Sequence, residues 1–144
     1  MANNKLGTFD FRKLNVIFGV AQITGYADGD ALTVEEKNAA FNIAEGADGH
    51  VDRIKNNANS LSITISLRQT SPTNQVLSAL HLADRAGGVP LPLLIKDRNG
   101  TTLFSAAQAW IEKFPKSAFG NEAKTREWVI HTGSQYVINI GGND

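Results

Sequence analysis

A strand with two different faces runs directly into a helix, and this segment constrains the fold of the chain most. Over residues 61–67, leucine and isoleucine alternate with serine and threonine, which is the pattern of a strand with one buried face. Ser71 then offers an N-cap, and Pro72 fits the first helical position because its missing N–H would be unpaired there anyway. We expect one α-helix over about residues 71–86, closed by Gly87.

This helix is set against a chain that otherwise reads as strands and turns. Its apolar stripe, formed by Val76, Leu77, Leu80 and Ala83, provides a face for packing on a sheet. Elsewhere, short alternating segments separated by turn residues give about seven to nine expected strands. An Asn-Gly pair at residues 99–100 is a hairpin signal between two of them.

The fold class that these elements predict is mainly β (α+β). We expect a two-sheet β-sandwich or barrel with the single helix flanking one side. The length of 144 residues fits one domain over residues 1–144, with room for a hydrophobic core.

The region of residues 35–59 reads as a long, extended and polar hairpin. It turns at the Gly-Ala-Asp-Gly sequence of residues 46–49. Residues 39–43 fit either a strand or a helix, and we favour a strand because Asn38 and Asn42 are poor residues inside a helix. Few side chains of this hairpin are able to form a core, so it needs a partner surface or stays mobile.

Charge and composition exclude several classes of protein. The chain has 14 basic and 14 acidic residues, so no net field attracts nucleic acid or an anionic membrane, and self-association is tolerated. It has no cysteine, which excludes disulfides and thiolate metal sites. The N-terminus shows no apolar signal segment, and no apolar run approaches the roughly 18 residues of a membrane helix. We expect a protein made in the cytoplasm.

Residues that carry chemistry are present but not in recognisable patterns. His50, His81 and His131 lack the spacing of metal ligands, and the Asp-Gly pairs at residues 28–29 and 48–49 are explained as turns. No nucleophile elbow, phosphate loop or dinucleotide fingerprint occurs. Basic residues form no stripe with aromatic residues, which disfavours direct recognition of nucleic acid. We expect no enzyme, no catalytic residues, no cofactor and no metal.

Several short motifs occur in a specific order along most of the chain. They are residues 23–31 (ITGYADGDA), 45–51 (EGADGHV), 67–78 (LRQTSPTNQVLS), 95–101 (IKDRNGT), 109–111 (AWI) and 127–128 (EW). Each motif alone is weak, because Asp-Gly and Asn-Gly are common turns. In their order and spacing, over about residues 14–140, the chain resembles the tail tube proteins of contractile-tailed bacteriophages.

The resemblance implies a structural protein of the virion tail that is made in the host bacterial cytoplasm. It implies homohexameric rings that stack into a hollow inner tube, with a contractile tail sheath outside and baseplate and tail terminator proteins at the ends. DNA would pass through the lumen during ejection without specific binding. The tube of type VI secretion has a similar fold, so the fold alone does not separate the two.

The expected site residues fall into two groups. The hairpin is expected to reach a neighbouring subunit or ring, because a ring needs one surface to meet a different surface of the next subunit. Its expected contact residues are Glu45, Gly46, Asp48, His50, Asp52, Arg53 and Lys55. For the lumen we expect neutral or acidic side chains, since phosphates bind where lysine and arginine cluster. The candidate lumen row is Ser62, Thr64 and Ser66, unless this row faces the helix or a neighbouring subunit.

Two alternatives to a tube subunit follow from the same features. One is a related baseplate or tube adaptor, or a type VI-like tube protein, with the same fold. The other, from a different class, is a monomeric β-barrel that binds a small ligand in an apolar cavity.

Overall fold

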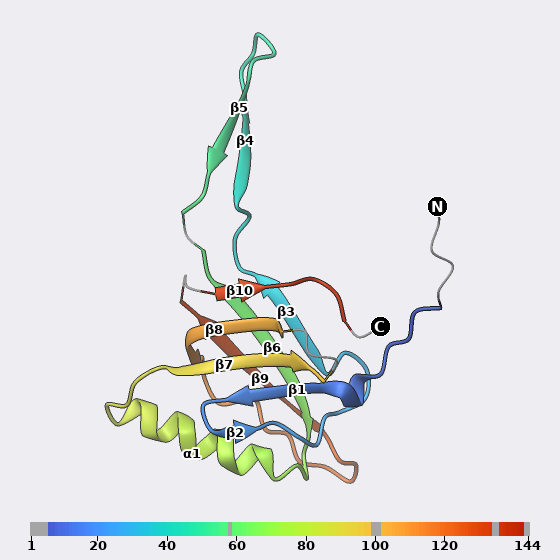
Figure 1. The fold of residues 1–144 in the computed structure, drawn as a ribbon. Coiled ribbons are helices and arrows are strands. Elements are labelled where there is room, and N and C mark those ends of the chain that lie inside the picture. The colour runs from blue at the N-terminus through green and yellow to red at the C-terminus, as the bar shows by residue number, and fades with distance from the viewer. Residues whose placement is uncertain (1–5, 58, 99–101, 134–135, 143–144) are drawn as a thin grey trace.

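The structure, a computed structural model, describes residues 6–57, 59–98, 102–133 and 136–142. It is mainly β with one α-helix, as the sequence predicts (Figure 1). The elements in chain order are η1 (Phe11–Lys13), β1 (Leu14–Phe18), β2 (Ala21–Gln22), β3 (Leu32–Glu36), β4 (Phe41–Glu45), β5 (Val51–Lys55), β6 (Leu61–Arg68), α1 (Thr73–Arg85), β7 (Leu91–Asp97), β8 (Thr102–Ile111), β9 (Thr125–Thr132) and β10 (Tyr136–Ile138).

Two sheets are present, and they are not closed into a barrel. The larger sheet has eight strands in the order β2-β1-β7-β8-β9-β6-β3, with β10 paired to β8 as a branch. Its end strands β2 and β3 do not pair with each other, so the expected barrel is wrong. The second sheet is the antiparallel pair β4–β5. The Asn-Gly hairpin expected between β7 and β8 lies outside the described residues.

The larger sheet bends so that its two halves share one core. Strands β8 and β9 pair through only three residue pairs, at Ala109–Ile111 of β8. Beyond this junction, β1 and β7 run across β6 at a steep angle (Figure 1). Buried residues of both halves, such as Val16 of β1, Ile95 of β7 and Ile63 of β6, belong to one hydrophobic cluster.

Strand β6 supplies the centre of this core. Leu61, Ile63, Ile65 and Leu67 are completely buried, and the residues between them are partly exposed. The predicted alternation of faces in this strand is therefore confirmed. On both sides β6 has antiparallel partners, β3 and β9, so all of its length is held within the sheet.

The helix α1 begins two residues later than expected, and only part of the expected stripe faces inward, because Leu77 is buried and Leu80 packs against the core. Its buried residues are Thr73, Leu77 and His81, whereas Val76 and Ala83 of the expected stripe are exposed. The reason lies at its first turn. The Ser71 hydroxyl donates to the Thr24 carbonyl (2.7 Å) and accepts from the Thr73 N–H (3.3 Å). These bonds set the rotation of the helix about its axis. Polar residues outside the apolar stripe therefore decide which face of the helix turns inward.

Gly87 ends the helix as predicted. Its φ of 101° lies in the left-handed region that glycine adopts without strain. The next residue, Gly88, returns to the helix through its N–H, which donates to the Ala83 carbonyl at 3.2 Å.

Candidate assembly surfaces

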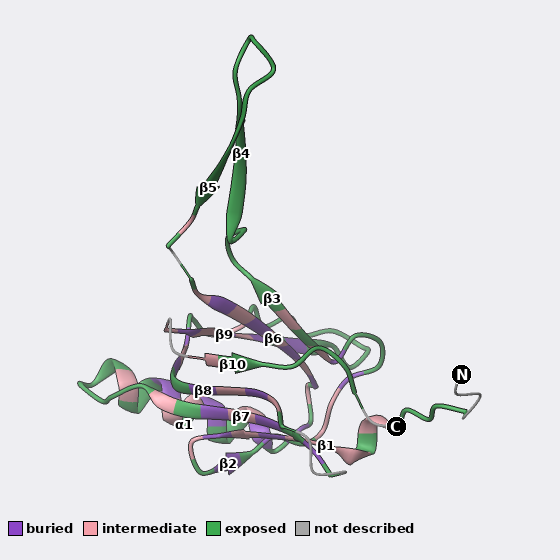
Figure 2. Ribbon diagram, turned by 45° about the horizontal axis from the view of Figure 1, so that its top comes forward, coloured by how far each residue is buried: buried purple, intermediate pink, exposed green. Residues whose placement is uncertain are grey.

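The pair β4–β5 projects from the rest of the molecule as a narrow arm (Figure 1). All ten residues of the two strands are exposed, and Figure 2 shows the arm without any buried residue. Five residue pairs join the strands, from Phe41–Lys55 to Glu45–Val51. A two-stranded hairpin that packs on nothing has little independent stability in water, so its surface is available to a partner.

Five of the seven expected contact residues gather at the end of this arm. The turn is closed by a bond from the Gly46 N–H to the His50 carbonyl (2.7 Å). Asp48 accepts from the His50 N–H through Oδ1 (3.1 Å), and His50 Nε2 lies 3.1 Å from Asp52 Oδ1. Glu45 occupies the last position of β4. These residues, Glu45 to Asp52, are here called the hairpin tip.

Arg53 and Lys55 lie nearer the body of the protein. In the antiparallel register Arg53 is opposite Ile43, and Lys55 is opposite Phe41, so all four side chains share one face. The Arg53 guanidinium lies over the Phe41 ring, 4.4 Å from its centroid.

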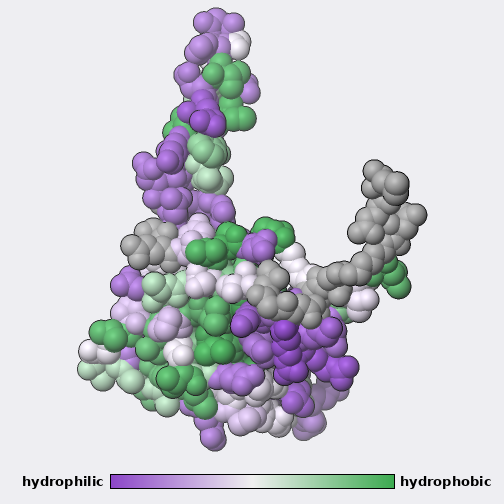
Figure 3. Space-filling model, viewed as in Figure 1, coloured by the Kyte–Doolittle hydropathy of each residue, from purple (hydrophilic) through white to green (hydrophobic). Residues whose placement is uncertain are grey.

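The same face carries apolar side chains that the expected contact set did not include. Phe41, Ile43 and Val51 are 48%, 70% and 56% exposed. Figure 3 shows hydrophobic residues along the arm between hydrophilic ones. The alternation of Phe41, Ile43 and Glu45 was the sequence signal for this face. Exposed apolar groups on a thin arm indicate a contact surface for another protein.

The candidate lumen row lies on β6, on the side away from the core. Ser62, Thr64 and Ser66 are half-buried and alternate with the four buried aliphatic residues. The helix packs on the other side, because Leu77 belongs to the same core cluster as Leu61. The alternative in which this row faces the helix is therefore wrong, and solvent or a neighbouring subunit remains for it.

Neighbouring strands continue this polar face. Glu35 of β3 is paired with Ser62, and Glu127 of β9 is paired with Ser66. On the same side, His131 is opposite Ser62, and its Nε2 lies 3.2 Å from Glu112 Oε2. Arg68 stands at the end of β6. The middle of the face is thus neutral to acidic.

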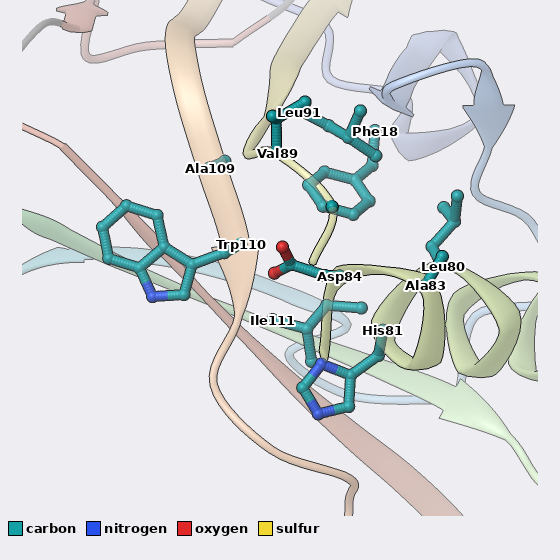
Figure 4. A pocket seen from close by; sticks show the side chains of 11 residues that line it. Phe18, Leu80, His81, Ala83, Asp84, Val89, Leu91, Ala109, Trp110 and Ile111 are labelled. Carbon is teal, nitrogen blue, oxygen red and sulfur yellow. The ribbon is translucent and has the colours of Figure 1, made fainter. Parts of the chain in front are cut away.

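An apolar cavity of about 210 Å³ lies between the end of α1 and the strands β1, β7 and β8 (Figure 4). Phe18, Leu91, Ala109 and Ile111 line it, together with His81 of the helix. Both ring nitrogens of His81 are buried and have no hydrogen-bond partner among the described residues, and the ring meets Phe114 edge-on at 4.8 Å. Burial lowers the pKa of His81 below its usual value of 6.5. A lining of this kind favours contact with apolar groups.

A second buried titratable group is Tyr26, which lies beside the 3₁₀-helix η1. Burial raises the pKa of Tyr26 to about 12. Its hydroxyl is buried and finds no hydrogen-bond partner in the described part of the chain, and its ring meets Phe11 edge-on at 5.0 Å. A phenol that stays protonated and packs on an aromatic ring has a structural rather than a catalytic environment.

Neither a metal site nor a membrane-spanning helix occurs among the described residues. No group of three or more histidine, cysteine, aspartate or glutamate side chains there is placed to hold a metal ion. Within the same ranges, no helix is long and apolar enough to cross a membrane.

Comparison with known protein families identifies the class of protein to which the chain belongs. A family described as bacteriophage PhiTE tail tube protein matches residues 15–139. The chain belongs to this tail tube family. The match covers both sheets and the helix, and a tail tube protein is a structural component of the phage tail.

A curated relative supports the same assignment. The tail tube protein is 35% identical over 125 residues to "Structural protein ORF10" of Pseudomonas phage KPP10. This similarity covers 84% of the tail tube chain and 71% of the relative.

Solved structures show that the fold recurs in contractile injection systems. One similar chain comes from the sheath–tube complex of an extracellular contractile injection system in its extended state, with a TM-score of 0.53 and 12% identity. The alignment covers 90% of each chain. Another comes from the anti-feeding prophage cap, a tube terminating cap, with a TM-score of 0.54, 13% identity and coverage of 96% and 97%. At these identities the likeness concerns the fold.

Proposed function

We propose that this tail tube protein assembles into hexameric rings, and that these rings stack into the hollow inner tube through which phage DNA passes. The observation that carries the proposal is the arm β4–β5, which exposes Phe41, Ile43 and Val51 and has no partner surface within the described chain. A head-to-tail contact, in which the arm of one copy meets a different surface of the next, extends into a stack without changing its interface.

The polar face of β3, β6 and β9 supports the lumen assignment. Its row Ser62, Thr64 and Ser66 offers hydroxyl groups, and Glu35 and Glu127 beside it repel phosphate. DNA slides along such a surface without the counterion release that accompanies binding to clustered lysine and arginine. The tail sheath is the proposed partner on the outside of the tube, in line with the sheath–tube complex named above.

Deletion of residues 44–57 tests the proposal. The deletion removes most of the arm and leaves the core cluster untouched, so we expect a folded subunit that no longer forms tubes. Circular dichroism checks the fold, and negative-stain electron microscopy checks assembly. The control is deletion of the exposed residues 6–9, which leaves the arm intact. Tubes of normal length from the 44–57 deletion would contradict the proposal.

A second candidate is an adaptor or cap at the end of a tube, because the fold also occurs in a tube terminating cap. The two roles differ in assembly. Purified tube subunits give stacks of many rings, whereas an adaptor or cap stops at one ring, and the same micrographs distinguish them.

A further inference from the structure

Arg126 is a buried charge without an acidic partner in the part of the chain that the structure describes. The residue is only 6% exposed. Its guanidinium donates to two backbone carbonyls, those of Thr125 (3.1 Å) and Ala118 (3.2 Å), and lies 5.1 Å from the centroid of the Phe119 ring. Carbonyl groups bear only partial charge, so the positive charge remains uncompensated. A guanidinium also has further N–H donors, arranged in a fork that fits a carboxylate.

This guanidinium lines an open pocket. The pocket, of about 410 Å³, lies between the first half of α1, the segment of residues 114–119 and the start of β9. Asn74 and Trp128 also line it, and they are bonded to each other, from the indole Nε1–H to Oδ1 at 2.9 Å. Arg126 is the charged residue in the lining of this pocket, which is here called the Arg126 pocket.

Lysine residues lie close in sequence to the residues that line the Arg126 pocket. The segment of residues 113–126 contains Lys113, Lys116, Lys124 and Arg126, against a single acidic residue, Glu122. The three lysines are exposed, and so is Phe119, at 80%. The lining of the pocket thus combines one buried cation, Arg126, with the exposed aromatic ring of Phe119, and the backbone of Lys124 is bonded to the lining residue Gln69.

The hairpin tip has the complementary character. Residues 45–52 contain three carboxylates, Glu45, Asp48 and Asp52, and no lysine or arginine. The tip and the first turn of α1 lie at opposite ends of the molecule (Figure 1). In a stack of identical subunits whose axis ran along the arm, the tip of one copy would be presented to the pocket end of the next copy.

We propose that the hairpin tip of one copy docks its carboxylates into the Arg126 pocket of a second copy in the adjacent ring. This inference rests on the proposed function, because it needs stacked rings. A carboxylate of the tip would accept charge-assisted hydrogen bonds from the remaining N–H groups of the Arg126 guanidinium. Phe119 would pack against the apolar face of the arm. Charge complementarity also fixes the polarity of stacking, since two tips or two pockets repel each other.

Charge reversal on the two surfaces tests the inference without disturbing a buried residue. Variant Glu45→Lys/Asp52→Lys changes the tip, and variant Lys116→Glu/Lys124→Glu changes the pocket rim. We expect each double variant to form rings whose stacking is weaker by about tenfold or more. The variant that combines all four substitutions should regain stacking. A further variant, Arg126→Gln, should stack weakly and lose much of the salt dependence.

Ring formation is measured by size-exclusion chromatography with light scattering, and stacking by the lengths of tubes in negative stain. The matched control is Lys96→Glu/Arg98→Glu, which reverses two exposed cations of β7 and its end. The inference would be overturned if both double variants stacked normally, or if the variant with all four substitutions did not recover stacking. Wild-type protein that forms neither rings nor stacks would instead overturn the proposed function, and with it this inference.

Discussion

His81 couples the stability of the subunit to pH. In the folded protein its ring is buried against Phe114, and neither nitrogen has a partner for an added proton. Burial is the main cause that lowers its pKa, Arg85 adds to the effect, and Asp84 opposes it. The unfolded chain therefore binds this proton more readily than the folded protein below the usual value of 6.5.

We expect the free energy of unfolding to be unaffected by His81 above pH 6.5 and to fall as the pH decreases below it. The slope contributed by one such group is at most about 1.4 kcal/mol per pH unit. Urea unfolding between pH 5 and 7.5 measures it. His81→Leu should flatten the slope in this range, and the exposed His50→Gln serves as the control. Equal slopes in all three proteins would contradict this role of His81.

The arm β4–β5 is the element whose dynamics should respond most to assembly. Its strands are exposed throughout and pair only with each other, so their hydrogen bonds open without disturbing the core. Strand β6, by contrast, is completely buried on one face and paired on both sides.

We expect amide exchange in β4 and β5 to be fast in the isolated subunit and to slow by about tenfold or more in tubes, while exchange in β6 stays slow in both. Hydrogen exchange with mass spectrometry measures this difference. Ile43→Ser removes an apolar contact of the arm, and it should keep β4 exchange fast under assembly conditions. Thr33→Ser on β3 is the matched control. Protection of β4 in the free subunit would argue against an arm that waits for a partner.

The same elements show which features of the fold could be predicted from the sequence and which could not. The faces of β6 were predictable, because strict alternation over Leu61 to Leu67 leaves only one way to bury four aliphatic side chains. The rotation of α1 was not, because the contact of Ser71 with Thr24 depends on a loop 47 residues away in the chain. The Arg126 pocket was equally hidden, since its walls come from separate parts of the chain.

For the candidate sites, the position of five of the seven expected contact residues at the end of an arm followed from the Gly-Ala-Asp-Gly turn. The burial of Arg126 did not follow, because an arginine in an alternating strand reads as exposed unless the loop that covers it is known. Here the carbonyl of Ala118 and the ring of Phe119 provide that cover.

At the scale of the whole molecule, the distribution of charge matters more than its sum of zero. Acidic residues gather at the hairpin tip, and basic residues gather in the segment of residues 113–126. The middle of the polar sheet face carries hydroxyl groups and the carboxylates of Glu35 and Glu127. From this distribution we expect the chain to attract copies of itself rather than DNA.

Lysine on the proposed lumen face should make the tube retain DNA. We expect Ser62→Lys/Ser66→Lys to form tubes of normal length that bind double-stranded DNA, with an affinity that falls steeply as salt increases. Filter binding of labelled DNA to purified tubes measures this. Lysine at Asn42 and Ala44 of the exposed arm adds the same charge outside the proposed lumen. DNA retention by that control, but not by the β6 variant, would place the lumen elsewhere.

The position of the arm in the chain has a mechanical consequence. Strand β3 leads into β4, and β5 leads into β6, so both roots of the arm continue into a paired ladder within the main sheet. Bonds from the Lys37 N–H to the Ser60 carbonyl and from the Asn56 N–H to the Ala40 carbonyl extend the pairing between them. A pull along the arm moves β3 and β6 together, so the load falls on the ladder between β6 and β9. Because antiparallel ladder bonds run perpendicular to the strands, its seven residue pairs are loaded in shear rather than one after another. Tension between rings would thus be borne by β6, in the middle of the most buried part of the protein.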